Sequence, residues 1–363
     1  MGTKSLDSNA IDFTDSGVNF VGRTSENNGI QGKIRKRVFE PNDPFTITAT
    51  VIGNYKYVKY QKEAYYCSQN INKLTPKVIF ERWNDHIAYY MISSIQKFVS
   101  LYDKQQGGYK LEDIRKHIVS LPRKNDKIDY DFIGDFIAEL EQARIAELEA
   151  YLLVTGLKDY ALTDEEQRAL NDFEKIKWCE YRIGDLFEKV KTRKLSYKAD
   201  DLPKEAIGKS VLPCLTSSFR NQGLNYFAPK EGATILKHVI SIPSNSDVYR
   251  VYFQSREFTV LSDAYAIRCK LNEIEFTSAQ YLFIALCINK VTDLPIYSYK
   301  NKLGGWNVVQ NKHIQIPTKD DKPDFSVMDN FISAIQKLVI KDVVLYADTK
   351  VNATQKVVNN QTD

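Results

Sequence analysis

The hydrophobic positions of this chain change their spacing several times along its length. From residue 1 to about residue 120, short alternating apolar runs such as FTITATVIG and EAYYCSQNI are separated by Gly, Asn and Pro. Alternation with a period of two, bounded by turn residues, predicts short β-strands. A helical segment from Pro76 to Tyr102 interrupts these runs, and a second one lies near Ser278 to Asn289 among later runs of the same kind. Each half of the chain is therefore expected to mix strands with helices.

Each half also ends in a long helical pattern. Spacings of three, four and seven define one apolar face after Asp131, and its members are Ile133, Phe136, Ile137, Leu140, Ile145, Leu148, Tyr151 and Leu152. The corresponding face in the second half comprises Met328, Phe331, Ile332, Ile335, Leu338 and Val339. Pro323 followed by Asp324 is a helix start signal. Between the halves, Thr163 and Glu166 have the spacing of a capping box, which predicts a helical connector.

The sequence repeats itself. The stretch LPRKNDKIDYDFIGDFI at 121–137 returns as IPTKDDKPDFSVMDNFI at 316–332. Further matches join 18–30 to 212–224, 60–77 to 253–270 and 107–109 to 304–306, all at offsets between 193 and 197 residues. Collinear matches at a nearly constant offset predict a tandem duplication.

These patterns predict an α/β fold of the α+β type. It consists of two tandem pseudo-symmetric domains, each followed by a long helix, and we expect the two helices to pair as an antiparallel coiled coil. The predicted division is 1–125 for the first domain, 126–176 for its helix and connector, 177–320 for the second domain and 321–363 for the last helix and tail. A helix of about 25 residues spans roughly 37 Å, close to one turn of B-DNA, about 34–36 Å.

Composition restricts function only slightly. A length of 363 residues suggests two or three domains with cores of their own. The balance of 50 Lys and Arg against 46 Asp and Glu permits a nucleic-acid partner without requiring one. Five scattered cysteines form no CxxC pair, which favours reduced thiols and a cytoplasmic protein. There is no signal-peptide pattern, and the longest apolar run, around 281–288, is too short to cross a membrane.

Polar, turn-rich segments at matching places in the two halves are the candidate DNA-contacting residues. Phosphate contacts use Lys, Arg and small polar groups, whereas base recognition uses bidentate donors and acceptors. The first segment offers Arg23, Thr24, Asn27, Asn28, Lys33, Arg35, Lys36 and Arg37, and the second offers Ser217, Ser218, Arg220, Asn221, Gln222, Asn225 and Tyr226. The alternative is an ordinary solvated turn in which Asn and Gly adopt positive φ.

Other basic, aromatic or polar stretches are weaker candidates for DNA contact. They contribute Lys56 and Lys59 from NYKYVKYQK, Lys104 and Gln105 from YDKQQGGY, Tyr299, Lys300 and Lys302 from YSYKNKLGGW, and Ser244 with Asn245. The Gly-Gly pairs at 107–108 and 304–305 would let a backbone approach a phosphate closely. Turn chemistry beside an aromatic anchor is an equally good explanation.

No catalytic constellation is evident in the sequence. GKS at 208–210 lacks the glycine that a phosphate loop needs five residues earlier, where Pro203 stands. Asp324, Asp348 and Lys350 fit a nuclease pattern only loosely, because Pro323-Asp324 is better explained as a helix start. The four histidines are far apart and suggest neither a metal site nor a triad. We therefore predict no catalytic and no metal-binding residues.

The ordered set of features resembles the specificity subunits of type I restriction–modification systems. It rests on WCEYRIGDLFEKV at 178–190 opening the second domain, on IPTKDDKPDFSVMDNFI closing it, and on their spacing. The resemblance implies two target-recognition domains that bind a bipartite, asymmetric double-stranded DNA site without catalysis. It implies docking of methyltransferase (modification) subunits and a restriction/translocase subunit, which would hold S-adenosylmethionine, ATP and Mg, so this chain would bind no cofactor. The alternatives are a recognition fragment of a fused restriction–methylation enzyme, or a repeat protein that binds only proteins.

One departure from this pattern concerns the start of the first half. TKSL at Thr3 to Leu6 aligns with TRKL at Thr192 to Leu195, so the first half lacks a counterpart of 178–190. Trp178, Tyr181, Ile183, Leu186 and Phe187 in that segment are suited to burial against their own domain. We therefore expect an open apolar groove in the first domain, left by a shortened or rearranged chain or filled by Val343 to Val358 or a partner subunit.

Overall fold

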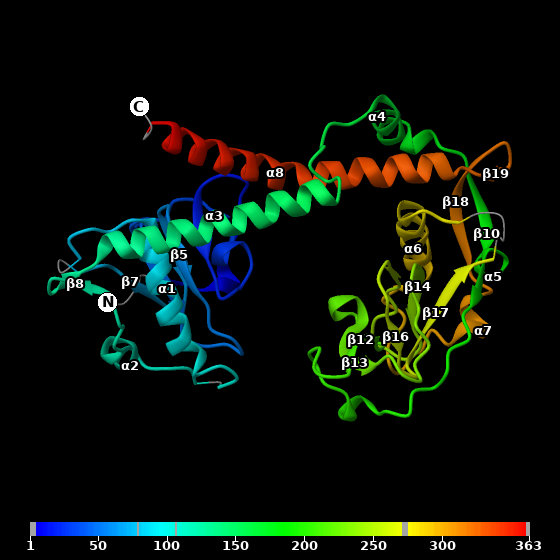
Figure 1. The fold of residues 1–363 in the computed structure, drawn as a ribbon, viewed down its shortest axis with the longest axis horizontal. Coiled ribbons are helices and arrows are strands. Elements are labelled where there is room, and N and C mark those ends of the chain that lie inside the picture. Colours follow the sequence, from blue (N-terminus) through cyan, green and yellow to red (C-terminus); the bar gives the residue numbers. More distant parts are fainter. Residues whose placement is uncertain (1–4, 78–79, 106, 271–274, 361–363) are drawn as a thin grey trace. The chain divides into compact units, whose positions relative to one another are not determined.

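The computed structural model describes residues 5–77, 80–105, 107–270 and 275–360. It divides into two compact units, Met1–Leu148 and Glu149–Asp363. Figure 1 shows strands followed by a long helix in each part of the chain. The two units are described separately below.

The first unit is a set of short strands around one main helix. Its strands are β1 (Ser5–Leu6), β2 (Val18–Val21), β3 (Ile30–Ile34), β4 (Thr46–Thr50), β5 (Val58–Gln61), β6 (Tyr65–Ser68), β7 (Ile71–Leu74), β8 (Arg123–Lys124) and β9 (Lys127–Ile128). Its helices are α1 (Asp85–Ser100), α2 (Leu111–Lys116) and most of α3 (Tyr130–Val154). The strands form sheets in the orders β1-β6-β2-β3, β5-β4-β7 and β8-β9.

Helix α1 covers the β5-β4-β7 sheet and closes the largest core of this unit, whose members include Ile47, Ile95 and Phe98. The helix is shorter than the predicted segment from Pro76 to Tyr102, and two residues of that segment, 78 and 79, lie outside the described part. It begins after Asn84, because the Asn84 side chain accepts a hydrogen bond from the Ile87 N–H at 3.0 Å.

The second unit repeats this arrangement and adds elements at both ends. Its strands are β10 (Trp178–Arg182), β11 (Phe187–Lys189), β12 (Ser210–Leu215), β13 (Leu224–Pro229), β14 (Val239–Pro243), β15 (Tyr252–Gln254), β16 (Thr259–Val260), β17 (Ala264–Cys269), β18 (His313–Lys319) and β19 (Lys322–Pro323). Its helices are α4 (Asp164–Asn171), α5 (Ile183–Leu186), α6 (Ser278–Thr292), α7 (Trp306–Val309) and α8 (Phe325–Asn360). The sheet orders are β10-β18-β19, β11-β17-β14-β15 and β13-β12-β16.

Strand pairing shows that the two units share one topology. Strand β4 pairs with β5 through Ile47 and Tyr60, and β14 pairs with β15 through Ile240 and Phe253. Ile240 follows Ile47 by 193 residues, and Phe253 follows Tyr60 by the same number. The parallel pairing of β2 with β6 likewise returns as β12 with β16. The α+β fold with two tandem domains is therefore confirmed, whereas the coiled-coil pairing of the long helices is not shown.

The repeated stretch at the start of each long helix forms the same hairpin twice. Asn125 and Asp126 have φ of 50° and 60°, and Asp320 and Asp321 have φ of 52° and 60°. Two consecutive residues with positive φ fit the type I′ turn of a two-residue hairpin. A carboxylate then caps each helix, since Asp129 accepts from the Phe132 N–H and Asp324 accepts from the Val327 N–H. Shared turn and cap chemistry explains why this stretch is the clearest repeat in the sequence.

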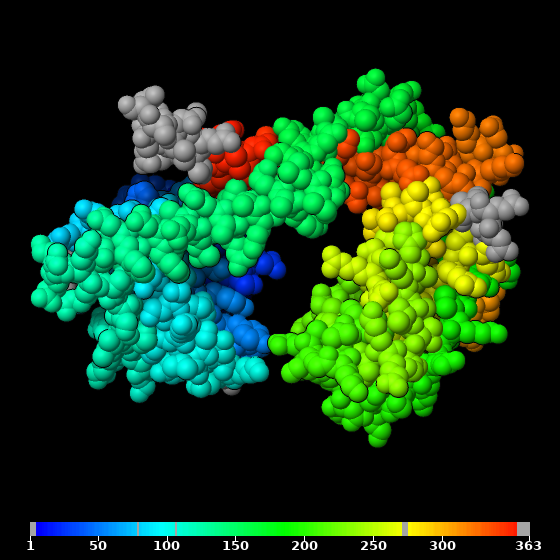
Figure 2. All heavy atoms as spheres, viewed as in Figure 1, coloured from blue at the N-terminus to red at the C-terminus, as the bar shows by residue number. Residues whose placement is uncertain are grey.

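The connector is helical, as the capping box predicts. The Thr163 hydroxyl accepts from the Glu166 N–H at 3.2 Å, and the Glu166 carboxylate accepts from the Thr163 N–H at 2.8 Å. Glu166 is buried and also accepts from Ser333 Oγ at 2.6 Å and Lys337 Nζ at 2.9 Å, both on α8. Figure 2 shows α4 lying directly against this part of α8.

The segment that opens the second domain is integrated into its core. Strand β10 pairs with β18 over five positions, and Ile183, Leu186 and Phe187 are buried while Trp178 and Tyr181 pack against the same cluster. At the offset of 195 that joins 121–137 to 316–332, Ile314 and Ile316 are each 1% exposed, whereas their counterparts Val119 and Leu121 are half-buried. The open apolar groove itself stays a prediction. The proposed origin of the groove and the predicted domain limits stay predictions.

Candidate nucleic-acid interface

Two polar loops, 22–29 and 216–223, occupy equivalent places in the two units, and we call them the first and second polar loops. Each is closed by one backbone hydrogen bond, from Gly22 N–H to the Gly29 carbonyl at 2.8 Å and from Thr216 N–H to the Gly223 carbonyl at 2.9 Å. The closing glycines have φ of 82° and 91°. Since residues that carry a side chain rarely adopt this backbone conformation, a glycine is needed at both places.

Hydroxyl groups and left-handed residues shape the two loops alike. Thr24 Oγ1 accepts from the Glu26 N–H at 3.2 Å, and Ser218 Oγ accepts from the Arg220 N–H at 3.1 Å. Each loop then has two successive residues with positive φ: Asn27 (43°) and Asn28 (53°) in the first, and Asn221 (47°) and Gln222 (52°) in the second. Thr24 and Ser218, both candidates for DNA contact, thus also hold their loops in shape.

A glutamine fastens each polar loop to the sheet beneath it. Gln61 Nε2 donates to the Asn28 carbonyl at 3.1 Å and to Thr48 Oγ1 at 3.1 Å. Gln254 Nε2 donates to the Gln222 carbonyl at 3.1 Å and to Ser241 Oγ at 3.0 Å. The loop conformation is therefore coupled to the central strand of each sheet through the same two bonds.

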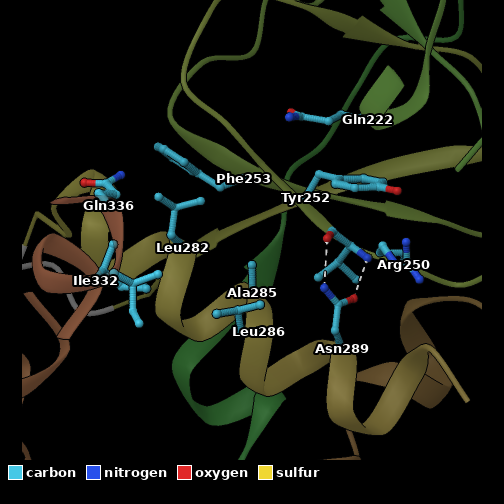
Figure 3. Close-up of a pocket in the computed structure, with 12 residues that line it drawn as sticks. Gln222, Arg250, Tyr252, Phe253, Leu282, Ala285, Leu286, Asn289, Ile332 and Gln336 are labelled. Carbon is cyan, nitrogen blue, oxygen red and sulfur yellow. Dashed lines mark hydrogen bonds between the residues drawn. The ribbon is translucent and has the colours of Figure 1, made fainter. Parts of the chain in front are cut away.

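A second amide side chain fixes the neighbouring strand to the main helix. Gln96 Oε1 accepts from the Val58 N–H at 2.9 Å, and Asn289 Oδ1 accepts from the Val251 N–H at 2.7 Å. Asn289 Nδ2 also donates to the Val251 carbonyl, and Figure 3 shows both bonds of this residue as dashed lines. Helix, strand and polar loop thus form one connected frame, which is present twice.

Side chains differ between the copies where they point away from this frame. Arg23 corresponds to Ser217, and Glu26 corresponds to Arg220, so the loops differ in charge at two positions. Glu26, Arg23 and Arg220 are exposed, whereas Ser217 is half-buried. The two units share the same supporting hydrogen bonds but present different side chains. Such a pair of surfaces is suited to bind two different ligands of the same chemical class.

The second polar loop borders a hollow of ≈ 510 Å³ that gathers five of the candidate residues. Its lining includes Ser217, Ser218, Arg220, Asn245 and Tyr299, together with Phe219, Ser246, Asp247 and Asp263. Asp263 Oδ2 accepts from the Ser217 N–H at 3.0 Å, and Asp247 Oδ1 accepts from the Tyr299 N–H at 2.9 Å. Ser244 is tied to the same place, because its N–H donates to the Asp263 carbonyl at 2.8 Å. Residues from distant parts of the sequence therefore meet at one polar surface.

Gln222 lines a different cavity, of ≈ 360 Å³, between β15, α6 and α8 (Figure 3). Its lining is mainly apolar and includes Phe253, Leu282, Leu286 and Ile332. A hydrocarbon wall offers few donors or acceptors for bases or phosphates. Of the two cavities, the hollow beside Asp263 has the chemistry that nucleic-acid contact requires.

The remaining candidates of the second unit fall into structural and exposed groups. Asn225 Nδ2 donates to Thr216 Oγ1 at 2.8 Å, and Tyr226 packs against a small core that contains Cys214. Both side chains therefore stabilise the loop and its strand. Lys300 and Lys302 are exposed, and Lys302 Nζ lies 4.9 Å from the centre of the Tyr299 ring, a cation–π distance.

In the first unit the basic residues follow the edge strand β3 and the segment after it. Lys33 and Arg35 are exposed. Lys36 forms an ion pair of 2.9 Å with Glu40, and the hydrogen bond and charge of Glu40 raise the pKa of the Lys36 ammonium. Arg37 is half-buried and its N–H donates to the Tyr66 hydroxyl at 3.0 Å. Lys33 and Arg35 are therefore the freest of the four for phosphate contact.

Lys56 is a correction to the predicted set. Its side chain is 1% exposed, and Nζ donates to the carbonyls of Gly53 at 3.0 Å and Gln105 at 3.1 Å and also to that of Tyr102. Three converging carbonyls hold the ammonium inside the unit, so it cannot reach a phosphate. The alternation of Lys and Tyr suggested a basic strand face, but β5 begins only at Val58.

Lys59, Lys104 and Gln105 are the remaining candidates of the first unit. Lys59 is half-buried on β5, while Lys104 and Gln105 are exposed. The nearby Gly108 has φ of 59°, and a Cβ built on it would lie 1.9 Å from the Val51 carbonyl oxygen. The close approach at this Gly-Gly pair is thus to the protein's own backbone, which favours the turn explanation over phosphate contact.

The Cys214 and Cys287 thiols are buried, and the possible metal ligands are scattered over the described residues. Burial raises the pKa of the Cys214 and Cys287 thiols to about 12, which keeps both protonated near neutral pH. Across the described ranges, no three His, Cys, Asp or Glu side chains are grouped so as to hold a metal ion.

Comparison with known proteins agrees with this geometry. The sequence profile of the family described as "Type I restriction modification DNA specificity domain" matches residues 2–150 and 175–345, one stretch for each copy. The chain belongs to this family. A search of curated proteins finds no match.

Solved structures of specificity subunits resemble the chain at low sequence identity. The type I restriction-modification system S subunit from M. genitalium has a TM-score of 0.50 and 14% identity, over 99% of this chain and 91% of that one. The HsdS subunit from Thermoanaerobacter tengcongensis has a TM-score of 0.30 and 12% identity, over 93% of this chain and 85% of that one. The first of these supports the fold of the specificity family, and the second is too distant to support an argument.

Sequence reasoning missed several residues of this candidate interface. Asp263, Asp247 and Phe219 line the hollow, and Gln96 and Asn289 support the frame from α1 and α6. Gln61 and Gln254 were aligned but given no role. Gln61 and Gln254 are 193 residues apart, as are Gln96 and Asn289. An amide side chain at the same offset in both copies is the sequence signal that indicates their shared role.

One further observation concerns membranes. In the part of the chain that the structure describes, no helix combines the length and the apolar character needed to span a bilayer.

Proposed function

We propose that this chain is a non-catalytic DNA-recognition subunit that binds a bipartite, asymmetric double-stranded DNA site. Each polar loop, with the polar groups beside it, contacts one half-site. The observation that supports this most directly is the doubled frame with different exposed side chains. Arg23 and Glu26 stand in the first loop where Ser217 and Arg220 stand in the second. Because hydrogen-bonding groups select bases, unequal groups imply unequal half-sites.

The contacts divide into two kinds under this proposal. Exposed cations, above all Lys33, Arg35, Lys300 and Lys302, contact phosphates and position the protein. Groups that line or border the polar loops contact base edges. In the second domain these groups surround the hollow that contains Ser217, Asn245 and Asp263.

The partners in this proposal are methyltransferase (modification) subunits and a restriction/translocase subunit. S-adenosylmethionine, ATP and Mg act on those subunits, and this chain binds no cofactor. Exposed apolar side chains on the long helices, such as Tyr151 and Leu153 on α3 and Val339 and Tyr346 on α8, support a docking role for the helices. The five free cysteines support a cytoplasmic location.

Selection from a pool of randomised duplexes tests the proposal. The full-length chain, alone and with methyltransferase subunits added, captures duplexes that are then sequenced. Two short enriched blocks of different sequence at a fixed separation are the expected result. No enrichment under either condition would contradict DNA recognition and would favour the protein-only alternative.

A second measurement addresses catalysis. The purified chain is incubated with the selected duplex and S-adenosylmethionine, and separately with Mg and ATP. Neither methyl transfer nor cleavage is expected. Turnover by the lone chain would favour the fused-enzyme alternative instead, which the family match does not support.

A further inference from the structure

We propose that the hollow of the second domain binds the amino-bearing edge of a cytosine or an adenine, with Asp263 as the hydrogen-bond acceptor. This inference rests on the proposed function and specifies what one part of the second half-site contains. It assigns Asp263 as a specificity-determining residue.

Asp263 occupies the turn between β16 and β17, where it connects two segments that line the hollow. Its Oδ2 accepts from the Ser217 N–H at 3.0 Å, and its carbonyl accepts from the Ser244 N–H at 2.8 Å. One carboxylate oxygen is therefore committed to the second polar loop. The carboxylate cannot turn away from the hollow without losing that bond.

The other carboxylate oxygen has no partner. Within the described residues, Asp263 Oδ1 and Asn245 Oδ1 both lie shielded from solvent without a hydrogen-bond donor, and both residues line the same hollow. Two shielded acceptors that lack donors are unfavourable until a donor arrives. Because both residues line the hollow, a donor bound there can reach these atoms once the rim is displaced.

Base edges differ in whether they can supply such a donor. Cytosine presents its N4 amino group and adenine its N6 amino group, and carboxylate side chains accept from cytosine N4. Guanine and thymine present the acceptors O6 and O4 at the corresponding places, which a carboxylate repels. The hollow therefore favours cytosine or adenine over guanine or thymine.

The rim supplies the other groups that a base and its phosphate need. Phe219 and Tyr299 are about half exposed at the edge of the hollow, and Arg220 lines it as well. Aromatic rings provide apolar contact with a base, and the arginine offsets the negative charge of Asp263 near a phosphate. The Asp263 carboxylate thus lies beside aromatic and basic groups that are compatible with DNA.

The first domain has a different group at the equivalent position. The Asn70 carbonyl accepts from the Val51 N–H at 2.8 Å, as the Asp263 carbonyl does from Ser244. Asn70 differs from Asp263 by 193 in residue number, the offset of the surrounding frame. An amide both donates and accepts, whereas an ionised carboxylate only accepts. Position 263 therefore distinguishes the two domains in the hydrogen-bonding character of the side chain, while the backbone hydrogen bond at this position is the same in both.

The variant Asp263→Asn tests this inference. The Ser217 N–H keeps the amide oxygen as its acceptor, so the amide NH₂ replaces the free carboxylate oxygen. In duplex selection with the full-length chain, one position of the second half-site should change from cytosine or adenine to guanine or thymine. The preference for the original base should fall by about 5- to 150-fold.

Glu257→Gln is the matched control, because it removes one negative charge from the same domain at an exposed carboxylate that pairs with Lys230 and does not line the hollow. It should leave the base preference unchanged. Equal changes in both variants would overturn the inference and assign the effect to charge alone.

A measurement on the unaltered protein avoids any effect of a substitution on folding. The selected duplex is rebuilt with purine in place of adenine, or with 2-pyrimidinone in place of cytosine, at the assigned position. Loss of the amino group should weaken binding by a similar factor. An enriched bipartite site that tolerates both the analogue and Asp263→Asn would refute this inference and leave the proposed function intact. Absence of any enriched site would contradict the proposed function itself.

Discussion

Gln61 and Gln254 show how one side chain on a neighbouring strand fixes the shape of each polar loop. Each donates to a loop carbonyl and to a hydroxyl on the central strand of its sheet. Neither belongs to the candidate set of DNA contacts, so their effect on DNA binding should be indirect. The same amide at the same place in both copies makes a paired experiment possible.

We expect Gln254→Ala to relax base preference in the second half-site only, and Gln61→Ala in the first only. Each change removes two hydrogen bonds of a partly or fully buried amide, so the free energy of unfolding should fall by about 1–3 kcal/mol. Duplex selection and thermal unfolding measure the two effects. Gln315→Ala, at an exposed position on β18, is the control. Relaxation of both half-sites by one variant would argue against separate loops.

Charge removal along β3 should act differently from changes in the loops. Replacing Lys33, Arg35, Lys36 and Arg37 by Ala should weaken binding to all duplexes and flatten its dependence on salt. Each lost phosphate contact reduces the slope by about 0.9. Because Lys36 is paired with Glu40 and Arg37 is half-buried, Lys33→Ala and Arg35→Ala together should account for most of the change. Titrations at several salt concentrations decide this, and a shift in base preference alone would contradict it.

The contrast between Lys56 and its neighbours explains which contacts the sequence could predict. Constant offsets between the copies identified the polar loops and, with them, Ser217, Ser218 and Arg220 of the hollow. The burial of Lys56 depends on three carbonyls that converge from Gly53, Tyr102 and Gln105, and no local pattern reveals such a meeting. Asp263 was missed for the related reason that its role arises from contacts with Ser217 and Ser244, which lie far from it in the sequence.

Among the elements, helices were predicted better than strand connections. Capping signals gave the starts of α4 and α8, and the apolar spacing gave α3. The start of α1 was placed too early, because apolar residues before Asn84 continue the helical pattern although the Asn84 cap begins the helix. The hairpins at 123–128 and 318–323 were not predicted, since their turns use Asn-Asp and Asp-Asp instead of the commoner Asn-Gly.

The contact of α4 with α8 should depend on pH through Glu166. Burial alone would raise the pKa of this carboxyl, but hydrogen bonds from Ser333, Thr163 and Lys337 together hold the pKa below its usual value of 4.5. A lowered folded-state pKa gives stability that is present above the unfolded pKa and is lost as pH falls through the folded one. Thermal unfolding from about pH 7 to about pH 3 should show this loss.

Glu166→Gln is the test of that assignment. The variant should be less stable near neutral pH, and its stability should change less on acidification than that of the unaltered chain. An identical pH profile in both proteins would exclude Glu166 as the responsible group. Glu165→Gln, an exposed carboxylate one position earlier on α4, serves as the control.

At the scale of the whole molecule, the proposed function makes the length of α3 a determinant of the DNA site. Insertion of about one helical turn within Tyr130–Val154 lengthens the helix by roughly 5.4 Å, and base pairs rise by about 3.4 Å each. We expect the gap between half-sites to grow by one or two base pairs while both half-site sequences stay the same. Duplex selection measures the gap, and an unchanged gap would show that α3 does not set it.

The doubled frame has a consequence for how this protein can change over generations. The bonds that hold each loop come from Gln61 or Gln254, Gln96 or Asn289, and backbone groups, while the side chains at the exposed positions 23, 26 and 220 take no part in these bonds. Substitutions at exposed positions of this kind usually alter folding free energy by less than about 0.5 kcal/mol. Mutation can therefore sample new ligand preferences in one copy without unfolding it, and without disturbing the preference already present in the other.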